Sequence, residues 1–494
     1  MNLDDTIVAI ATPPGRGGIG VVRLAGPEAR AIAAPMLRLK HALEPGKVIF
    51  GELVQPELIE APDTSSSRAF APAPNTRIDE VVVTYFQKPH SYTTDDIIEI
   101  SAHGSPVVLR HIVEMAIARG ARMAEPGEFT MRAFLNGRLD LTQAEAVRDL
   151  IDSQTLFQAK VAAQQLEGSL SKRLKPVKEK LVQLIALLEA GIDFADDDVS
   201  IAPDTEILKH IRAVQRPLKE LAASFAYGKL VHEGLTLAIV GRPNVGKSSL
   251  FNRLVERERA IVTAQPGTTR DLVSETVAIG GIPVRLVDTA GIRQALDEAE
   301  NIGIQKSMEA LADADLVLVV LDASQPASEE DFKLLRQLEG RAAIIVENKS
   351  DKRSSQFSVA SAQSAPNIQS PVASSGSDEI PATSIQTSAK NIVQTSAITG
   401  MGIAELRAAI LQQAGGESSP QVESGFLTNV RHQKLVNDAL TRLDAAENAI
   451  PAHVPHEMLL LDLYAALRLL DGITGATTTD DILNLIFGTF CIGK

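Results

Sequence analysis

Tryptophan is absent from this 494-residue chain, and aromatic residues make up only 4% of it. The sequence therefore does not indicate an aromatic platform of the kind on which the bases of single-stranded nucleic acids stack. The single cysteine, Cys491, excludes a disulfide framework and a cysteine-based zinc site within one chain. No apolar run approaches the roughly 20 residues that a membrane span needs, and the first residues lack the pattern of a secretory or mitochondrial leader. We therefore expect a soluble, cytoplasmic protein without a membrane partner.

The chain is acidic overall, since 48 basic and 62 acidic residues give a formal net charge of −14. Proteins that bind nucleic acid mainly through their overall charge are usually basic. An RNA substrate would therefore have to contact a local basic patch. The apolar content of 45% is normal for a globular protein, and the length suggests about three domains.

The N-terminal part mixes short apolar runs with glycine and proline. Such runs predict strands, which we place at IVAIA, IGVVRLA, EVVVTYF and IIEIS. The pattern of Pro106–Arg119 predicts a helix. A segment rich in serine, proline and alanine, residues 62–76, is expected to be a surface loop.

Helical patterns follow in two separate stretches. The first begins near residue 140, where Thr142-Gln-Ala-Glu145 fits a capping box at the start of a helix. Apolar residues then recur at helical spacing, at Leu181, Leu184, Ile185 and Leu188. The second stretch runs from about Thr428 to Phe487.

Between these stretches, strands and helices alternate. The runs LTLAIV, VRLVD, LVLVVLD and AAIIV are short and almost entirely apolar, which is typical of parallel strands buried on both faces. A hairpin around Gly280-Gly281 predicts one antiparallel edge strand. Residues 353–393 turn to serine, glutamine, alanine and proline, so we interpret them as a flexible insertion.

A phosphate-binding motif stands at the start of this region. Gly241-Arg-Pro-Asn-Val-Gly246-Lys247-Ser248 matches G-x-x-x-x-G-K-[ST], follows a predicted strand and precedes a predicted helix. Glycine lets backbone N–H groups approach phosphate, and the helix N-terminus favours negative charge. Lys247 would reach the β- and γ-phosphates as a catalytic cation, and Ser248 would ligate Mg²⁺.

Two further motifs complete a guanine-nucleotide site. Asp288-Thr-Ala-Gly291 follows the strand VRLVD, where Asp288 would support Mg²⁺ and the Gly291 N–H would face the γ-phosphate. Asn348-Lys-Ser-Asp351 follows the strand AAIIV. The Asp351 carboxylate can accept bonds from guanine N1–H and the exocyclic amine, a donor pair that adenine lacks.

The loops around the nucleotide are less sharply defined. In Pro266-Gly-Thr-Thr-Arg-Asp271, Thr269 is the natural second Mg²⁺ ligand. Thr387-Ser-Ala389 and Thr395-Ser-Ala397 both fit a guanine-base loop. We favour Ser396-Ala397, because the loop and helix of ITGMGIAELRAAIL follow it.

These motifs predict a GTP- or GDP-binding site in a Ras-like P-loop domain. The residues that these motifs place at the nucleotide are Asn244, Val245, Gly246, Lys247, Ser248, Ser249, Pro266, Gly267, Thr268, Thr269, Asp288, Thr289, Ala290, Gly291, Asn348, Lys349, Ser350, Asp351, Ser396, Ala397 and Ile398.

Three longer segments carry a more specific resemblance. They are DTIVAIATPPGRGGIGVVRLAG near the start, EPGEFTMRAFLNGRLDLTQAEAVRDLI in the middle and FCIGK at the end. Together they resemble the MnmE (TrmE) family of tRNA-modification GTPases along nearly the whole chain. The resemblance implies an α/β plus all-α fold: an α+β folate-binding and dimerisation domain at 1–139, a discontinuous helical domain at 140–230 and 416–494, and an inserted GTPase domain at 231–415.

The resemblance also implies partners and chemistry. The family acts as a homodimer with an MnmG (GidA)-type flavoprotein, in a heterotetramer or larger complex, and FAD belongs to that partner. Together they add an aminomethyl-type group to C5 of the tRNA wobble uridine, position 34. The expected carbon source is a tetrahydrofolate derivative in its 5,10-methylene or 5-formyl form.

In this family potassium and dimerisation of the GTPase domains replace an arginine finger. The matching potassium ligands are Asn244, Thr263, Gln265 and Thr268. The resemblance also implies that Thr263, Ala264 and Gln265 lie at the nucleotide. A cation there would neutralise charge that develops in the transition state. Glu300 matches the acid that orients the attacking water, although Asp297 and Glu298 lie nearby.

For folate, the matching positions are Arg23, Glu99, Arg138 and Lys494. The family usually has lysine where this chain has Arg138, so charge is kept but geometry is not. Cys491 lies in the matching terminal Cys-x-Gly-Lys. It is either a reactive thiol near the folate or a buried inert one.

Three functions compete. The first is a GTPase that gates folate-dependent tRNA modification. The second is a regulatory switch of the ribosome-assembly type, which would need neither the N-terminal segment nor FCIGK. The third is a folate-dependent transferase with a vestigial nucleotide domain, which the intact motifs disfavour.

Overall fold

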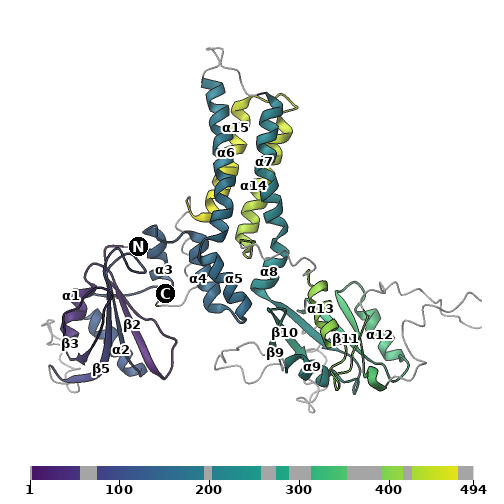
Figure 1. The fold of residues 1–494 in the computed structure, drawn as a ribbon, viewed down its shortest axis with the longest axis horizontal. Helices are drawn as coiled ribbons and strands as arrows, with labels where there is room; N and C mark the ends of the chain where they lie inside the picture. The colour runs from purple at the N-terminus through teal and green to yellow at the C-terminus, as the bar shows by residue number, and fades with distance from the viewer. Residues whose placement is uncertain are drawn as a thin grey trace, which may run out of the picture. The chain divides into compact units, whose positions relative to one another are not determined.

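The computed structural model describes residues 3–55, 75–193, 203–256, 274–288, 313–352, 392–415, 425–476 and 493. The chain divides into two compact units (Figure 1), each with its own sheet. Unit 1 comprises Met1–Arg148, Gln165–Ile211 and Thr441–Lys494, and unit 2 comprises Asp149–Gln164 and Arg212–Leu440. Within the described ranges, no helix is both long and apolar enough to cross a bilayer.

Unit 1 contains a seven-stranded sheet in the order β3-β4-β5-β6-β2-β1-β7. Its neighbouring strands are antiparallel, except that β1 and β7 are parallel. The strands are β1 (Ile7–Ile10), β2 (Gly17–Ala25), β3 (Leu37–Leu39), β4 (Val48–Val54), β5 (Arg77–Phe86), β6 (Ile97–Gly104) and β7 (Arg122–Met123). The four strands and the helix expected from the sequence are confirmed, whereas β3, β4 and β7 were not predicted.

One face of this sheet carries the core. Because side chains alternate along a strand, Val81, Val83 and Tyr85 of β5 are buried on the same side. Helix α2 supplies Leu109 and Ile112 to the same cluster. The helices and 3₁₀ turn of this part are α1 (Ala29–Ala33), η1 (Ala34–Met36), α2 (Pro106–Ile117) and α3 (Glu128–Leu135).

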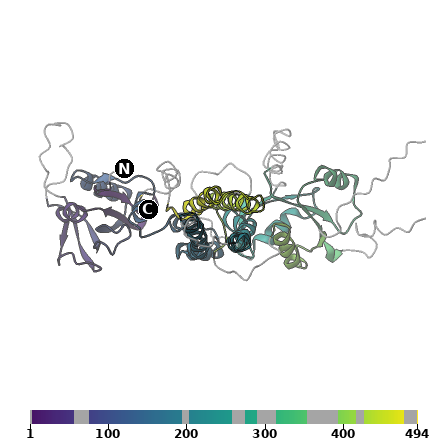
Figure 2. The ribbon, with the colours of Figure 1, turned by 90° about the horizontal axis from the view of Figure 1, so that it is seen from above.

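Long helices follow the sheet. They are α4 (Leu141–Asp152), α5 (Leu156–Leu166), α6 (Ser169–Asp193), α7 (Asp204–Ala223), α14 (Val430–Ala449) and α15 (His456–Thr474). Helices α6 and α15 lie side by side (Figure 1 and Figure 2). The predicted apolar stripe on α6, Leu181 to Leu188, is buried, as are Leu459, Leu463 and Leu470 of α15. Burial of these stripes stabilises the helix pair.

The predicted capping box at the start of α4 is wrong by two residues. Thr142 lies inside the helix, and Asp140 takes the cap position instead. The Gln143 N–H donates to Asp140 Oδ1 (2.9 Å), and the Asp140 N–H donates to Gln143 Oε1 (3.0 Å). Asp and Gln therefore form the reciprocal pair that Thr142 and Glu145 were expected to form.

Unit 2 contains a six-stranded sheet in the order β13-β12-β11-β8-β10-β9. All its pairs are parallel except the β9–β10 hairpin, as predicted. The strands are β8 (Leu235–Val240), β9 (Ser274–Ile279), β10 (Ile282–Asp288), β11 (Leu316–Asp322), β12 (Ala343–Asn348) and β13 (Ile392–Gln394). The helices are α8 (Phe225–Glu233), α9 (Lys247–Val255), α12 (Glu329–Gln337) and α13 (Ile403–Gln413), with the 3₁₀ turn η3 (Ser350–Lys352).

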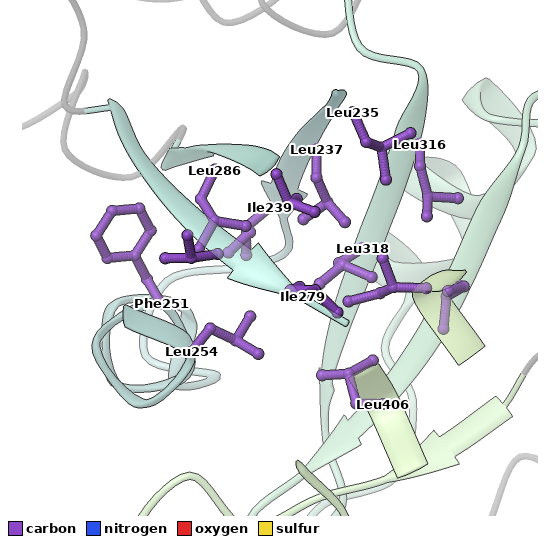
Figure 3. Close-up of a cluster of buried hydrophobic side chains, with 14 of the residues drawn as sticks. Leu235, Leu237, Ile239, Phe251, Leu254, Ile279, Leu286, Leu316, Leu318 and Leu406 are labelled. Carbon is purple, nitrogen blue, oxygen red and sulfur yellow. The ribbon is translucent and has the colours of Figure 1, made fainter. Parts of the chain in front are cut away.

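The core of unit 2 lies between the sheet and helices α9 and α13 (Figure 3). Leu237 and Ile239 of β8 belong to one buried cluster with Leu254 of α9 and Leu406 of α13. Strand β11 is buried along nearly its whole length, which explains its continuous apolar run. This packing fixes the carboxyl ends of β8, β11 and β12, where the motif residues lie.

The structure corrects one predicted domain boundary and the predicted end of one insertion. The proposed boundary between residues 230 and 231 falls inside α8. The proposed insertion 353–393 ends too late, because Ile392 and Val393 belong to β13, which pairs with β12. The remaining part of that insertion, and residues 62–74 of the other predicted loop, lie outside the described residues.

Candidate functional site

The phosphate-binding motif forms a loop between β8 and α9. Gly241 and Gly246 have φ of 151° and 97°, and Asn244 has φ of 63°. A Cβ atom at Gly241 would lie 2.4 Å from the Val320 carbonyl oxygen, so the loop passes too close to β11 for any side chain there. Gly246 caps α9, whose N-terminal N–H groups favour an anion.

Lys247 lies at the first position of α9 and is buried. Its Nζ donates to the carbonyl oxygens of Gly241 (2.9 Å) and Arg242 (2.7 Å). The ammonium is therefore held within the loop that the motif predicts for phosphate. Ser248 and Ser249 follow in the first turn and are exposed.

Asn348, at the end of β12, joins this loop to a second one. Its Nδ2 donates to the Val245 carbonyl (3.0 Å), and its Oδ1 accepts from the Ala397 N–H (3.0 Å). The side chain is 1% exposed. A buried amide that uses both ends in this way fixes the relative positions of the two loops.

Lys349 forms a second link to the phosphate-binding loop. It adopts φ of 62°, and its Nζ donates to the Asn244 carbonyl (2.7 Å) and to Asp322 Oδ2 (2.6 Å). Burial raises the pKa of Asp322, but hydrogen bonds from Lys349 and Ser324 outweigh it, so this pKa lies below its ordinary value. The Asp322 carboxylate is therefore ionised at neutral pH. Asp351 lies in η3 and is exposed.

The structure places one of the two candidate base loops at the site. Ser396 and Ala397 are buried next to Asn348, and the Thr395 carbonyl accepts from the Ser350 N–H (3.1 Å). Ile398 is 68% exposed. The alternative, Ser388-Ala389, lies outside the described residues.

Asp288 ends β10 and is in register with Ile239, next to the strand that leads into the phosphate-binding loop. The other predicted residues of this site lie outside the described ranges: Thr263, Ala264, Gln265, Pro266, Gly267, Thr268, Thr269, Thr289, Ala290, Gly291 and Glu300. Their positions remain predictions.

Sequence reasoning missed two arginines of this site. Arg242 Nε donates to Asp331 Oδ1 (2.8 Å) in the capping box that starts α12. Arg253, on α9, donates to the carbonyls of Ala397 and Ile398. The Ser328-x-x-Asp331 pattern could have identified the capping box. No local signal could have identified the contacts of Arg253, because they join segments 144 positions apart.

In unit 1 two of the predicted folate residues, Arg23 and Arg138, lie against Tyr92, and a third, Glu99, pairs with Arg23. Arg23 forms an ion pair with Glu99 (2.7 Å), and its guanidinium lies 5.8 Å from the centre of the Tyr92 ring. Arg138 lies 5.0 Å from the same centre and donates to the Tyr92 carbonyl (2.7 Å). Burial raises the pKa of Tyr92. The four side chains therefore form one polar and aromatic group, in which Tyr92 was not predicted.

The C-terminal end of the chain reaches this group. Arg23 Nη1 donates to the Gly493 carbonyl (3.5 Å), although the two residues are 470 positions apart. A Cβ atom at Gly493 would lie 2.4 Å from the Ile10 carbonyl oxygen, so this glycine packs closely on β1. Lys494 and Cys491 themselves lie outside the described residues.

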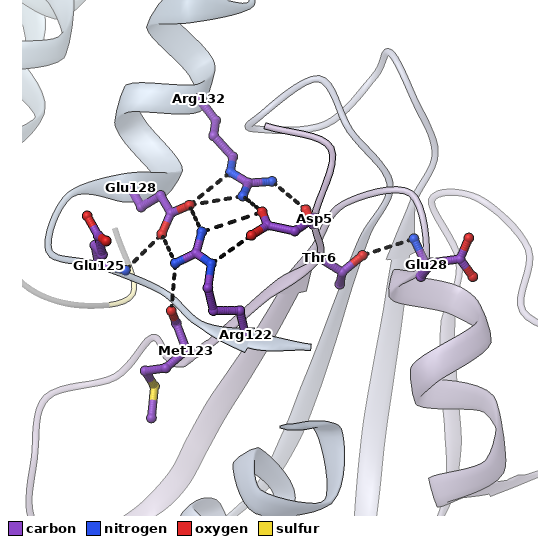
Figure 4. Close-up of polar contacts among 8 residues, drawn as sticks. All are labelled: Asp5, Thr6, Glu28, Arg122, Met123, Glu125, Glu128 and Arg132. Atoms are coloured by element: carbon purple, nitrogen blue, oxygen red, sulfur yellow. Dashed lines mark hydrogen bonds and ion pairs between the residues drawn. The ribbon is translucent and has the colours of Figure 1, made fainter. Parts of the chain in front are cut away.

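A partly buried ionic network joins α3 to β7 and to the segment before β1 (Figure 4). Arg132 and Glu128, both 0% exposed, form an ion pair of 2.9 Å. Arg132 also pairs with Asp5 (2.5 Å), and Arg122 pairs with Asp5 (2.7 Å) and Glu128 (2.6 Å). The two positive and two negative charges balance, which lowers the cost of burying Arg132 and Glu128. The network holds the helix that carries Phe129, whose ring lies 5.6 Å from the Arg23 guanidinium.

Comparisons with known proteins agree along the whole chain. A family model described as the GTP-binding protein TrmE N-terminus matches residues 6–138, and one for the MnmE helical domain matches residues 141–491. The tRNA modification GTPase MnmE of Koribacter versatilis (strain Ellin345) is 64% identical over 498 residues, which cover 100% of both chains. The protein of the same name from Aquifex aeolicus (strain VF5) is 40% identical over 99% of this chain and 100% of its own.

Among solved structures, the G domain of the T. maritima FeoB iron transporter is 26% identical, with a TM-score of 0.26. It covers 36% of this chain and 98% of its own. The full-length relatives cover 99–100% of this chain and 100% of their own lengths, and the two family models match residues 6–138 and 141–491. This chain belongs to the MnmE (TrmE) family and is a tRNA-modification GTPase.

Proposed function

We propose that this chain binds and hydrolyses GTP at the loop between β8 and α9. The observation that carries the proposal is the double contact of Asn348. Its amide joins Val245 of the phosphate-binding loop to Ala397 of the base loop. One site therefore presents backbone donors for phosphate and, through the neighbouring Asp351, a carboxylate for the guanine edge.

Lys247 would stabilise the β- and γ-phosphates, and Ser248 and Thr269 would hold Mg²⁺. The exposed Ser248 hydroxyl in the first turn of α9 fits a hard cation that prefers oxygen ligands. Bound there, Mg²⁺ would neutralise charge on the phosphate oxygens. Glu300 would orient the attacking water.

Potassium would bind through Asn244, Thr263, Gln265 and Thr268 in a dimer of the nucleotide domains. Asn244 has a left-handed backbone conformation, and its carbonyl accepts a hydrogen bond from Lys349. Both features support a fixed position for Asn244 as a potassium ligand. A monovalent cation would add positive charge where an arginine finger otherwise acts. GTP turnover should therefore be much faster in KCl than in NaCl. Equal rates in the two salts would refute the potassium assignment.

The group around Tyr92 would hold a tetrahydrofolate derivative. Glu99, held by Arg23, can accept from the amino and ring N–H donors of the pterin, and a cation such as Arg138 or Lys494 can pair with the glutamate tail. The charges of the described residues fit such a ligand, because the group contains two guanidinium ions and one carboxylate. The folate would supply the one-carbon unit.

The complete activity would be the addition of an aminomethyl-type group to C5 of the wobble uridine, position 34 of tRNA. The chain would act in the cytoplasm as a homodimer with an MnmG (GidA)-type flavoprotein that holds FAD. The N-terminal segment 1–139 would bind folate and dimerise, and the helical segments would connect it to the GTPase domain 231–415. The names of the full-length relatives support the tRNA role.

The experiment that tests this function is deletion of the gene followed by mass spectrometry of tRNA nucleosides. Loss of the modified wobble uridine, restored by the intact gene but not by a Lys247→Ala variant, is the expected result. Unchanged modification would remove the tRNA role and favour a regulatory switch of the ribosome-assembly type. Purified protein that binds ATP as readily as GTP would contradict the nucleotide assignment.

A further inference from the structure

Arg253 connects the phosphate-binding helix to the base loop. It lies on α9, which begins at Lys247. Its Nε donates to the Ala397 carbonyl (2.9 Å), and its Nη2 donates to the Ile398 carbonyl (2.5 Å). Its Nη1 pairs with Glu256 (3.0 Å), one turn farther along the chain. One guanidinium therefore holds two successive carbonyl groups of the loop.

These contacts determine the direction of a backbone donor. The Ala397 carbonyl and the Ile398 N–H belong to one planar trans peptide unit, so they point in opposite directions. Because Arg253 holds the carbonyl on the side of α9, the Ile398 N–H points away from that helix. No acceptor for this N–H lies among the residues that the structure describes, and Ile398 is 68% exposed.

The positive charge of Arg253 also makes the Ile398 N–H a stronger hydrogen-bond donor. A hydrogen bond from a guanidinium is stronger than a neutral one, and it polarises the peptide unit that accepts it. The Ile398 N–H is therefore a better donor than an isolated amide. The preceding N–H, that of Ala397, is bonded to Asn348 Oδ1. Of these two amides, that of Ile398 is the one left to meet a ligand.

We propose that Arg253 is a positioning residue for guanine recognition. By fixing the peptide between Ala397 and Ile398, it directs the Ile398 N–H to the O6 acceptor of a guanine base. Guanine carries an acceptor at this position, whereas adenine carries an amino group. The inference rests on the proposed function, because it assumes that the nucleotide base lies at this loop.

The test compares GDP with 2-aminopurine riboside 5′-diphosphate, which lacks O6. This nucleotide also lacks the N1–H of guanine and keeps the phosphates and the exocyclic amine, so the effect of each Arg253 variant is compared within each nucleotide. Binding of each is measured by calorimetry or by competition, with the full-length chain. The variant Arg253→Met removes all donors, and Arg253→Lys keeps a charge but cannot hold two carbonyls in one plane.

Two matched controls separate the loop contacts from general effects on α9. Glu256→Gln weakens the ion pair and leaves both carbonyl contacts in place. Arg407→Met removes another guanidinium that binds α9, through the Leu254 carbonyl (3.2 Å), without touching Ala397 or Ile398. Both controls should bind GDP within about two-fold of the native chain.

For Arg253→Met we expect GDP binding to weaken about 10- to 100-fold, because a charged hydrogen-bonding group is lost. Binding of the 2-aminopurine nucleotide should change less than about three-fold, since it never used the Ile398 N–H. Arg253→Lys should lie between the native chain and Arg253→Met and serves as the second variant if the methionine form does not fold.

Equal weakening of both nucleotides, or unchanged GDP binding, would overturn the role of Arg253. Failure of the native chain to bind GDP at all would instead count against the proposed function. The two failures are therefore distinguishable within one set of titrations.

Discussion

Arg242 Nε donates to Asp331 Oδ1 across 2.8 Å, and this contact attaches the phosphate-binding loop to the start of α12. Asp331 is 1% exposed and also accepts from the N–H and hydroxyl of Ser328. The carbonyl of Arg242 is in turn one of the two acceptors for Lys247. The second residue of the motif therefore links a capping box to the lysine that is expected to meet the phosphates.

The first prediction concerns this pair. Arg242→Met should destabilise the chain by about 1–3 kcal/mol, because it leaves a buried carboxylate without its cation. The measurement is urea unfolding of Arg242→Met, Asp331→Asn and the double variant. We expect the double variant to lose less stability than the sum of the single losses. Strictly additive losses would show that the contact contributes nothing of its own.

The second prediction separates two residues of one motif. Asn348→Ala removes the contacts to Val245 and Ala397, so GDP binding should weaken about 100-fold and stability should fall by about 1–3 kcal/mol. Asp351→Asn, at an exposed position, should weaken GDP binding and leave stability within about 0.5 kcal/mol of the native value. Titration with GDP and urea unfolding check both. A stable Asn348→Ala variant would contradict the structural role of this amide.

The third prediction is a dependence on pH. Burial raises the pKa of Glu128, but hydrogen bonds from Arg122, the Glu125 N–H and Arg132 outweigh it, so the pKa lies below its usual 4.5. The pKa of Asp5 is likewise lowered by its arginine partners, against the effect of burial. In the unfolded chain these groups bind protons at a higher pH than in the folded one. The network therefore stabilises the fold above about pH 4.5 and loses this effect as the pH falls through the folded pKa values.

The variant Glu128→Gln tests how much Glu128 contributes to this pH dependence of stability. At neutral pH it should be less stable by about 3 kcal/mol, because the buried Arg132 loses one of its two ionic partners. Between about pH 5 and pH 3 its stability should fall less steeply than that of the native chain. Unfolding by urea at a series of pH values is the measurement. Parallel curves for the two proteins would exclude Glu128 as a source of the pH dependence.

The fourth prediction concerns close packing in unit 2. A Cβ atom at Gly228, in α8, would lie 1.8 Å from the Leu427 carbonyl oxygen and 2.9 Å from the Phe426 ring. Gly228→Ala should therefore cost about 3 kcal/mol, although alanine favours helices more than glycine. Ala226→Ser, at an exposed position of the same helix, should change stability by less than about 0.5 kcal/mol. A stabilised Gly228→Ala variant would show that this contact is not as close as described.

The fifth prediction tests the aromatic ring of the proposed folate site. Tyr92→Ala removes the ring that faces both Arg23 and Arg138, so binding of 5-formyltetrahydrofolate should weaken about 10-fold. Tyr92→Phe keeps the ring and loses only the hydroxyl contact to Thr130 (2.9 Å), so its affinity should stay within about three-fold. Calorimetry with the full-length chain measures both. Equal losses would assign the role to the hydroxyl group instead.

Local patterns determined much of the fold. The apolar runs of β8, β10, β11 and β12 were predicted because strands buried on both faces have a composition that can be read directly. The motif from Gly241 to Ser248 was equally clear, because its spacing places a glycine loop between a strand and a helix. The capping residue of α4 was misplaced, since Asp140 and Thr142 both suit a cap and only the surrounding structure selects one.

Contacts between distant segments could be decided only by the tertiary structure. Arg253 and Ala397 are 144 positions apart, and Asp5 and Arg132 are 127 positions apart. A guanidinium can pair with many acceptors, and its sequence position does not say which one folding brings within 3 Å or so. The sequence thus specified the chemical groups of the nucleotide site, whereas the packing of α9, α3 and the sheets decided which charged side chains hold them in place.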